Sequence, residues 1–252
     1  MTGAVPAWPP SSLPRLYVEQ PLAEGVAVTL EGPPANYLAN VLRLAAGAQV
    51  KLFDNVSGEW LAEIVDAGRK KVTLNLHWRL RGREEVPDLW LLFAPLKRGR
   101  IDWMVEKATE LGVARLIPVL TQRTIVDKLN PGRLFAHAIE AAEQCERTAL
   151  PELAAPRKLD ALLGDWPVGR TLYFADEAGG NPLADAAERG PAAILIGPEG
   201  GFTDAERTAL RAVPQVRRVS LGPRILRADT AAVAAVSLWM AAAGDWERSV
   251  AR

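Results

Sequence analysis

The chain has 252 residues, 49% of them hydrophobic, which is enough to bury one large core or two modest ones. Its 30 Lys and Arg residues balance its 30 Asp and Glu residues, which argues against indiscriminate binding to nucleic acid but leaves room for a local basic face. One cysteine and two histidines exclude an internal disulfide and argue against a structural zinc site, so we expect no metal site.

The sequence also argues against export and against a membrane span. Residues 1–14 lack the basic and then apolar pattern of a secretory signal. The longest apolar stretch, residues 231–243, is shorter than the roughly 20 residues that a membrane-spanning helix needs, and we expect it to form a buried helix. Together with the single cysteine, this predicts a cytoplasmic protein without membrane contact.

The N-terminal part of the chain has the pattern of a small β-barrel. Residues 1–14 are rich in proline and are expected to form a flexible arm. From residue 15 to residue 82, short and partly alternating apolar segments are separated by turn residues, which is typical of strands. The predicted strands are residues 16–18, 26–30, 49–53, 59–64 and 71–76. One predicted helical segment, residues 36–44, interrupts them.

The pattern changes after a polar segment that ends at Pro87, and we expect a second domain over residues 87–252. Its predicted strands are residues 89–94, 116–120, 171–175, 192–196 and 216–221, and its first predicted helices are residues 101–111 and 134–148. Continuous apolar strands that alternate with helices predict a mostly parallel α/β sheet with both faces covered. The fold class is therefore α/β, or α+β when the barrel is included.

A glycine-rich loop follows the predicted strand 192–196. Gly197, Gly200 and Gly201 permit close approach of a ligand and positive φ angles. The loop follows the carboxyl end of a strand, where open α/β sheets bind ligands. It matches neither the phosphate-binding P-loop nor the dinucleotide-binding pattern, and by itself it is more typical of a tight turn between a strand and a helix. A capping box is predicted for the next helix, formed by Thr203 and Glu206.

A second loop, residues 221–227, follows the last predicted strand. Ile225 and Leu226 could form an apolar wall for a purine ring. Arg224 and Arg227 could hold a carboxylate or a phosphate, although solvated surface arginines are an equally ordinary interpretation. Two such loops after two strands of one sheet favour a shared pocket. The candidate caps of the following helix are Asp229 and Thr230.

Two groups of basic residues suggest that the protein binds RNA. Lys97, Arg98 and Arg100 cluster where a predicted helix begins, a position at which the helix dipole disfavours cations. Residues 68–82 contain five Lys and Arg residues and no acidic residue. Positive charge placed against local preference indicates an anion nearby, whereas residues 69–71 are equally typical of a solvated face.

The motifs and their order along the chain resemble those of a known family. The two loops, together with residues 96–112, 15–18, 41–44, 121–124 and 140–147, are similar to the bacterial RsmE family. Its members are 16S rRNA uracil-N3 methyltransferases of the SPOUT superfamily. The resemblance covers nearly the whole chain.

Three positions depart from the family pattern. Asn36 stands where histidine is usual, Glu146 where glycine is expected and Asp229 where glutamate is expected. The resemblance implies a PUA-like RNA-binding barrel over residues 15–82 and a SPOUT domain with a trefoil knot over residues 87–252. It also implies a homodimer, with S-adenosyl-L-methionine bound at the knot and the RNA site completed by the partner subunit. The implied activity is methylation of N3 of a specific uridine in the 16S rRNA of the small ribosomal subunit.

The loops and the resemblance together suggest roles for individual residues. The predicted cofactor-binding residues are Leu195, Ile196, Gly197, Glu199, Gly200, Gly201, Leu221, Gly222, Arg224, Ile225, Leu226 and Thr230. Arg227 and Arg147 are candidates for holding the phosphate of the target nucleotide or stabilising the uracil anion. Glu199 is either a general base or a brace that holds its loop closed. The predicted RNA-binding residues are Arg15, Arg43, Lys97, Arg98 and Arg100.

The residues leave two alternatives open. One is a SPOUT methyltransferase that acts on another RNA, and the other is a non-catalytic RNA-binding factor in ribosome assembly. Cofactor binding followed by methyl transfer separates an enzyme from a binding factor. Mapping of the methylated nucleotide separates the two enzymes.

Overall fold

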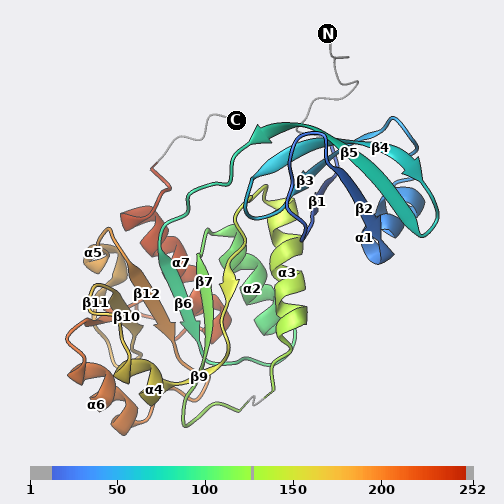
Figure 1. Ribbon diagram of the computed structural model, residues 1–252. Helices are drawn as coiled ribbons and strands as arrows, with labels where there is room; N and C mark the ends of the chain where they lie inside the picture. Colours follow the sequence, from blue (N-terminus) through green and yellow to red (C-terminus); the bar gives the residue numbers. More distant parts are fainter. Residues whose placement is uncertain (1–12, 126–127, 248–252) are drawn as a thin grey trace. The chain divides into compact units, whose positions relative to one another are not determined.

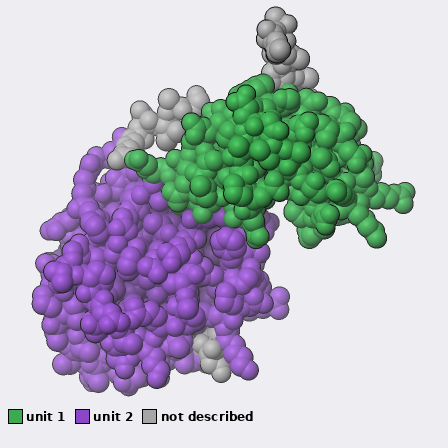
Figure 2. Space-filling model, viewed as in Figure 1, with its two compact units in different colours: residues 1–85, 143–149 green, residues 86–142, 150–252 purple. Residues whose placement is uncertain are grey.

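The computed structural model describes residues 13–125 and 128–247, and residues 1–12 of the predicted arm lie outside this range. The chain divides into two compact units (Figure 2). Unit 1 comprises residues 1–85 and 143–149, and unit 2 comprises residues 86–142 and 150–252. The strand pattern of the sequence gives no sign that residues 143–149 belong to unit 1.

The described strands of unit 1 form one curled sheet in the order β1-β3-β4-β5-β2 (Figure 1). They are β1 (Arg15–Tyr17), β2 (Ala27–Glu31), β3 (Gln49–Phe53), β4 (Glu59–Ala67) and β5 (Lys71–Arg81). β1 pairs with β3 in parallel, and the other neighbours are antiparallel. This sheet confirms the predicted barrel-like N-terminal fold, and β4 and β5 extend beyond the predicted strand ends.

The helical segment predicted at residues 36–44 begins and ends earlier than expected. Helix α1 (Gly32–Asn36) has two prolines in its first turn, where a missing N–H needs no partner. It continues into a π-helical turn, η2 (Tyr37–Val41). Arg43 then takes a positive φ of 55°, which is incompatible with continuing the helix.

A buried cluster of charges lies in unit 1. Glu59 accepts hydrogen bonds from Arg15 and from Arg81, whose Nε lies 3.0 Å from Glu59 Oε2. The side chains of Arg15 and Glu59 are each 4% exposed. Burial alone raises the pKa of the Glu59 carboxyl, but the hydrogen bonds from Arg81 and Arg15 outweigh it and leave the pKa below its ordinary value.

We expect Glu59→Gln to destabilise unit 1 mainly above the acid range. Because the folded pKa of Glu59 is below its ordinary value of 4.5, its stabilising contribution is complete above that value and is lost as the pH falls through the folded pKa. The substitution should lower the free energy of unfolding by about 3 kcal/mol near neutral pH. The loss should become smaller as the pH falls below 4.5 towards the folded pKa. Urea titrations near neutral pH and at several lower pH values measure it, and equal losses at every pH would contradict the assignment to Glu59.

The described strands of unit 2 form a sheet in the order β11-β13-β10-β12-β6-β7-β8, and β9 pairs with β7. They are β6 (Leu89–Phe93), β7 (Arg115–Leu120), β8 (Glu152–Leu153), β9 (Arg157–Lys158), β10 (Thr171–Ala175), β11 (Asn181–Pro182), β12 (Ala192–Ile196) and β13 (Val216–Ser220). These neighbours pair in parallel, which confirms the predicted sheet.

Helices cover both faces of this sheet. They are α2 (Arg100–Glu110), α3 (Pro131–Gln144), α4 (Leu159–Gly164), α5 (Leu183–Ala186), α6 (Asp204–Ala212) and α7 (Ala228–Ala243). Ile194 and Ile196 of β12 pack in the core that includes α2 and α7, whereas Ala193 and Leu195 pack in the core that includes α4 and α6. None of the helices within residues 13–125 and 128–247 combines the length and the apolar character needed to cross a membrane.

The starts of α6 and α7 differ in how they are capped. At α6 the predicted capping box is confirmed, because Glu206 N donates to Thr203 Oγ1 (3.3 Å) and Thr203 N donates to Glu206 Oε2 (2.8 Å). At α7 the N-cap is Arg227, without a side-chain cap hydrogen bond. The prediction of Asp229 or Thr230 as the cap is wrong, because the helix begins before either residue.

The connection from β13 to α7 crosses the sheet. α7 packs against β12, β6, α2 and α5, whereas β13 lies on the other side of β10. The segment between them, residues 221–227, therefore passes across the carboxyl ends of neighbouring strands. The knotted path that the resemblance implies requires this crossing.

One departure from the family pattern, Glu146, lies just after the end of α3. The helix ends at Gln144, before the predicted residue 148, and Glu146 then takes a φ of 64°, a conformation that favours glycine. Two contacts within unit 1 hold Glu146 there: Lys51 Nζ lies 3.5 Å from its carboxylate, and Arg81 donates to its carbonyl. The family glycine is therefore replaced at a position where the backbone conformation favours glycine.

Candidate functional site

A cavity of about 690 Å³ lies in unit 2, at the carboxyl ends of the neighbouring strands β13, β10 and β12. The segments that follow these strands supply most of its wall, with Arg100 of α2 and Arg207 of α6 beside them. This volume is in the range of sites that bind small organic molecules, roughly 300–1,000 Å³. The position is the one at which open α/β sheets bind ligands.

The loop after β12 is shaped by glycines and one phenylalanine. Gly201 has a φ of 68°, and its N–H donates to the carbonyl of Pro198 (2.9 Å) to form a tight turn. A β-carbon at Gly197 would lie 2.4 Å from the ring of Phe202, so a side chain there would displace that ring. Phe202 packs edge-on against Phe174 with 5.0 Å between ring centroids. The packing of Phe202 against Gly197 and Phe174 therefore fixes the loop.

The loop after β13 presents apolar side chains to the cavity. Gly222 has a φ of 111°, and its N–H donates to Ser220 Oγ (3.2 Å). Ile225 lines the cavity and is 90% exposed, and Leu221 and Leu226 line the same wall half-buried. This is the apolar wall that the sequence predicts.

An ion pair joins α2 to the loop after β12 at the cavity. Arg100 Nη1 pairs with Glu199 Oε1, and the two side chains are 37% and 43% exposed. Arg100 was predicted to bind RNA, and the structure places it on the cavity wall. The pair ties the glycine loop to another element, which is what the bracing role of Glu199 requires.

Sequence reasoning missed three charged residues of the cavity. Asp176 and Glu177 follow β10 directly, and Arg207 reaches the cavity from α6. The two acidic residues stand where the predicted loops stand on the neighbouring strands, directly after a continuous apolar segment. That position was the signal that could have found them.

Most of the predicted cofactor-binding residues come together at this cavity. Those that line it are Ile196, Gly197, Glu199, Gly201, Leu221, Gly222, Arg224, Ile225 and Leu226. Three others lie elsewhere. Leu195 packs in the core on the α4 and α6 face, the Gly200 carbonyl accepts a hydrogen bond from Arg123 (2.7 Å), and Thr230 is exposed in the first turn of α7.

The two arginines predicted to act in catalysis lie in different units. Arg227 is exposed and lines the cavity. Arg147 is buried in unit 1, where its Nε lies 3.4 Å from Glu84, and burial lowers the pKa of its guanidinium. Within residues 13–125 and 128–247, no three His, Cys, Asp or Glu side chains are grouped to hold a metal ion.

The predicted RNA-binding residues also differ in exposure. Lys97 and Arg98 are exposed just before α2, and Arg43 is exposed at the end of the helical segment in unit 1. Arg15 is buried, and its guanidinium contacts Glu59 and a backbone carbonyl. Contact between Arg15 and RNA would require this buried cluster to open.

Two family models match the chain. The model described as an RNA methyltransferase domain matches residues 83–240, and the model described as an RNA methyltransferase PUA domain matches residues 30–76. The first match contains every residue that lines the cavity, and the second lies within unit 1.

Several curated relatives carry one name. The chain is 30% identical over 229 residues to the ribosomal RNA small subunit methyltransferase E of Rickettsia conorii, covering 88% of this chain and 93% of the relative. It is 33% identical over 234 residues to the protein of the same name from Synechocystis, covering 88% and 76%. The matches therefore extend across both units.

Solved structures give the same result. The chain superposes on the ribosomal RNA small subunit methyltransferase E of Neisseria gonorrhoeae, solved with S-adenosyl methionine, with a TM-score of 0.84 and 26% identity over 93% of this chain and 99% of that one. A putative methyltransferase from Legionella pneumophila, solved with bound SAM, superposes with a TM-score of 0.83 and is 30% identical. The match covers 92% of this chain and 99% of that one. With the fold, the family-model match and these relatives in agreement, the chain belongs to the RsmE family of RNA methyltransferases.

Proposed function

We propose that the protein transfers a methyl group from S-adenosyl-L-methionine to N3 of a uridine in the 16S rRNA of the small ribosomal subunit. The observation that carries this proposal is the cavity at the ends of β10, β12 and β13, which lies inside the match to the RNA methyltransferase domain. The names of the relatives support ribosomal RNA as the substrate, and the neighbour from Neisseria gonorrhoeae supports the cofactor. Such a substrate implies a cytoplasmic protein.

The cavity suits this cofactor in size and in chemistry. Ile225 and Leu226 offer an apolar surface for the adenine ring. The backbone of the loops at Gly197–Gly201 and at 221–226 offers N–H and carbonyl groups at close range, because glycines in both loops keep side chains out of the way. These residues would hold the cofactor.

The bound cofactor supplies a methyl group that its sulfonium already activates. The chain must hold the uridine in line with that methyl group and take up the charge that develops as N3 loses its proton. Arg227, exposed on the cavity wall, is placed to stabilise the uracil anion or to hold the phosphate of the target nucleotide. Glu199 is the candidate base, and its ion pair with Arg100 favours the bracing role.

The direct test is mass mapping of modified nucleotides in 16S rRNA from cells with and without this protein. We expect one uridine to lose a methyl group when the protein is absent and to regain it with purified protein and cofactor. Methylation of a different RNA would support another SPOUT specificity. Binding of RNA without methyl transfer would support an assembly factor and contradict the proposal.

We expect Lys97→Ala combined with Arg98→Ala to weaken RNA binding and to flatten its salt dependence. Both residues are exposed just before α2, and fewer counterions are released when two phosphate contacts are lost. The slope of log K against log salt should fall by about 1–2. Filter binding at several salt concentrations measures it. Lys158→Ala with Arg189→Ala removes the same charge from exposed positions elsewhere and is the control. A double variant that loses cofactor affinity and keeps its RNA affinity would contradict the assignment of Lys97 and Arg98 to RNA binding.

We also propose that the protein is a homodimer whose partner subunit completes the RNA site. Sedimentation velocity should then show twice the chain mass at working concentrations, and specific activity should fall on dilution below the dimer dissociation constant. A monomer with full specific activity at every dilution would contradict this proposal.

A further inference from the structure

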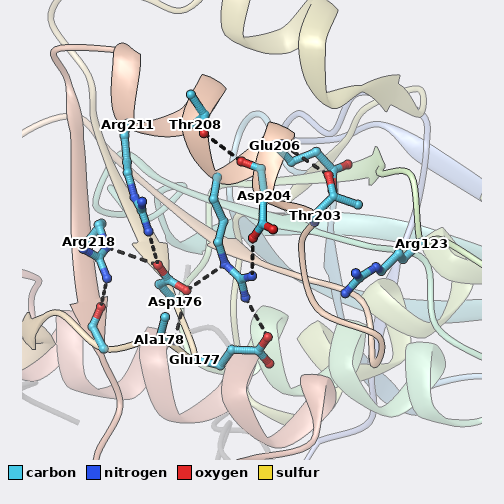
Figure 3. A network of polar contacts seen from close by, with 12 residues as sticks. Arg123, Asp176, Glu177, Ala178, Thr203, Asp204, Glu206, Thr208, Arg211 and Arg218 are labelled. Atoms are coloured by element: carbon cyan, nitrogen blue, oxygen red, sulfur yellow. Dashed lines mark hydrogen bonds and ion pairs between the residues drawn. The ribbon is translucent and has the colours of Figure 1, made fainter.

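A buried carboxylate anchors three arginines beside the cavity. The side chain of Asp176 is fully buried, and it accepts hydrogen bonds from Arg207 (Nε to Oδ1, 3.2 Å) and Arg218 (Nε to Oδ2, 3.1 Å). Arg211 lies 3.7 Å from Oδ2, and the N–H of Ala178 donates to Oδ1 (Figure 3). A carboxylate with this many partners restricts their positions, so Asp176 fixes where the Arg207 guanidinium lies.

Arg207 in turn holds a second carboxylate at the cavity. Its Nη2 donates to Glu177 Oε1 at 2.6 Å, and Glu177 lines the cavity with 53% of its side chain exposed. Burial lowers the pKa of the Arg207 guanidinium, but its hydrogen bonds and ion pairs with Glu177 and Asp176 outweigh that effect and leave the pKa raised. Among residues 13–125 and 128–247, the only hydrogen bond that the Glu177 carboxylate accepts is the one from Arg207 to Oε1. One carboxylate oxygen is thus fixed and the other is left for a ligand.

Glu177 also lies against the glycine loop after β12. A β-carbon at Gly201 would lie 2.6 Å from Glu177 Oε1 and 3.3 Å from Oε2, so the missing side chain of Gly201 makes room for the carboxylate. β10 and β12 are parallel neighbours, and an acidic residue after one strand therefore stands beside the glycine loop after the other. In open α/β sheets that bind nucleotides, an acidic residue near the glycine loop accepts a hydrogen bond from the ribose.

We propose that Glu177 accepts hydrogen bonds from the ribose hydroxyl groups of the adenosine cofactor, and that Arg207 is the positioning residue that holds it. This assignment rests on the proposed function. An ionised carboxylate accepts hydrogen bonds without donating any, and each of the two adjacent ribose hydroxyl groups has one O–H to donate to it. The ammonium group of the cofactor fits this position worse, because the Arg207 cation would repel it. Asp176 and Glu199, the other acidic residues that line the cavity, are engaged by arginines.

Calorimetry with S-adenosylhomocysteine, its 2′,3′-dideoxy analogue and 5′-methylthioadenosine tests the assignment. We expect the wild type to bind the dideoxy analogue roughly tenfold more weakly than S-adenosylhomocysteine. Glu177→Gln should bind these two ligands about equally. It should also bind 5′-methylthioadenosine, which keeps the ribose and lacks the amino acid, more weakly than the wild type by the same factor. Asp204→Asn is the matched control, because Asp204 lies 3.8 Å from Arg207 but is exposed and does not line the cavity.

Arg207→Gln tests whether Arg207 positions the Glu177 carboxylate or only stabilises the fold. It should reduce the ratio between the affinities for S-adenosylhomocysteine and its dideoxy analogue, whereas a structural role alone would weaken both ligands equally. Wild-type selectivity in Glu177→Gln would overturn the assignment. So would a loss that disappears with 5′-methylthioadenosine, since the carboxylate would then act on the amino acid. A wild-type protein that binds none of the three ligands would overturn the proposed function together with the assignment.

Discussion

Arg227→Ala should lower the turnover number for methyl transfer about a hundredfold, the usual effect of losing one group that stabilises developing charge. Arg227 lies at the N-cap of α7, on the wall of the cavity, with its side chain exposed. Its guanidinium forms no ion pair with any residue of the described ranges 13–125 and 128–247, so it is available to a ligand. Several side chains of α7 pack in the core of unit 2, and this packing restricts where the N-cap residue lies.

Separate measurements of turnover and of RNA affinity test this role. Removal of a group that acts on the reacting base lowers the turnover number. Removal of a group that binds the RNA equally well in the ground state and the transition state changes only the affinity. Arg217→Ala is the matched control, because Arg217 is an exposed arginine on β13 that does not line the cavity. Unchanged turnover in Arg227→Ala would make this residue a solvated surface arginine.

The five longer strands of unit 2 were predicted close to their observed bounds, whereas the two-residue strands β8, β9 and β11 were not predicted. β10 and β12 have the predicted bounds, because a continuous apolar segment between turn residues leaves little choice of where a buried strand begins and ends. The strand order was not predictable. β13 lies beside β10 rather than beside β12, and no local pattern shows this.

Helix ends were predicted less well, for reasons that lie in the backbone. At α1 the prolines Pro33 and Pro34 mark a helix start that the apolar pattern alone places too late. At α7 the helix begins directly after the loop that crosses the sheet. The predicted cap residues Asp229 and Thr230 therefore lie inside its first turn. At α3 the end depends on Glu146 in a conformation that its residue type disfavours.

The candidate site was predictable as far as it is local. The two loops were found because glycines, a capping box and apolar strands occur together within short segments. The position of Asp176 and Glu177 directly after an apolar segment was a local signal, but their contact with Arg207 of α6 arises only through the order of the elements in space, which no local pattern shows. The burial of Arg15 was missed for a similar reason, since its buried partner Glu59 is distant in sequence.

Gly201→Val should abolish measurable binding of S-adenosylhomocysteine while leaving the protein folded. Gly201 has a φ of 68°, which is unfavourable for valine by about 1–2 kcal/mol. Its β-carbon would lie 2.6 Å from Glu177 Oε1 and would displace that carboxylate from the cavity wall. The added side chain would also take up space that the cofactor needs. Calorimetry measures the affinity, and thermal unfolding should show a fall in Tm of about 2–8 °C.

Gly25→Val separates backbone strain from loss of the site. Gly25 has a φ of 74° and nothing within 4 Å of an added β-carbon, so it carries the same strain far from the cavity in sequence and within unit 1. We expect it to lower Tm by less than Gly201→Val does, because no contact is strained at Gly25, and to leave cofactor affinity unchanged. A double-mutant cycle of Gly201→Ala and Glu177→Ala should isolate the contact between the two positions, because shortening Glu177 should recover the part of the lost stability that is due to that contact. Normal cofactor affinity in Gly201→Val would mean that the loop is only a turn.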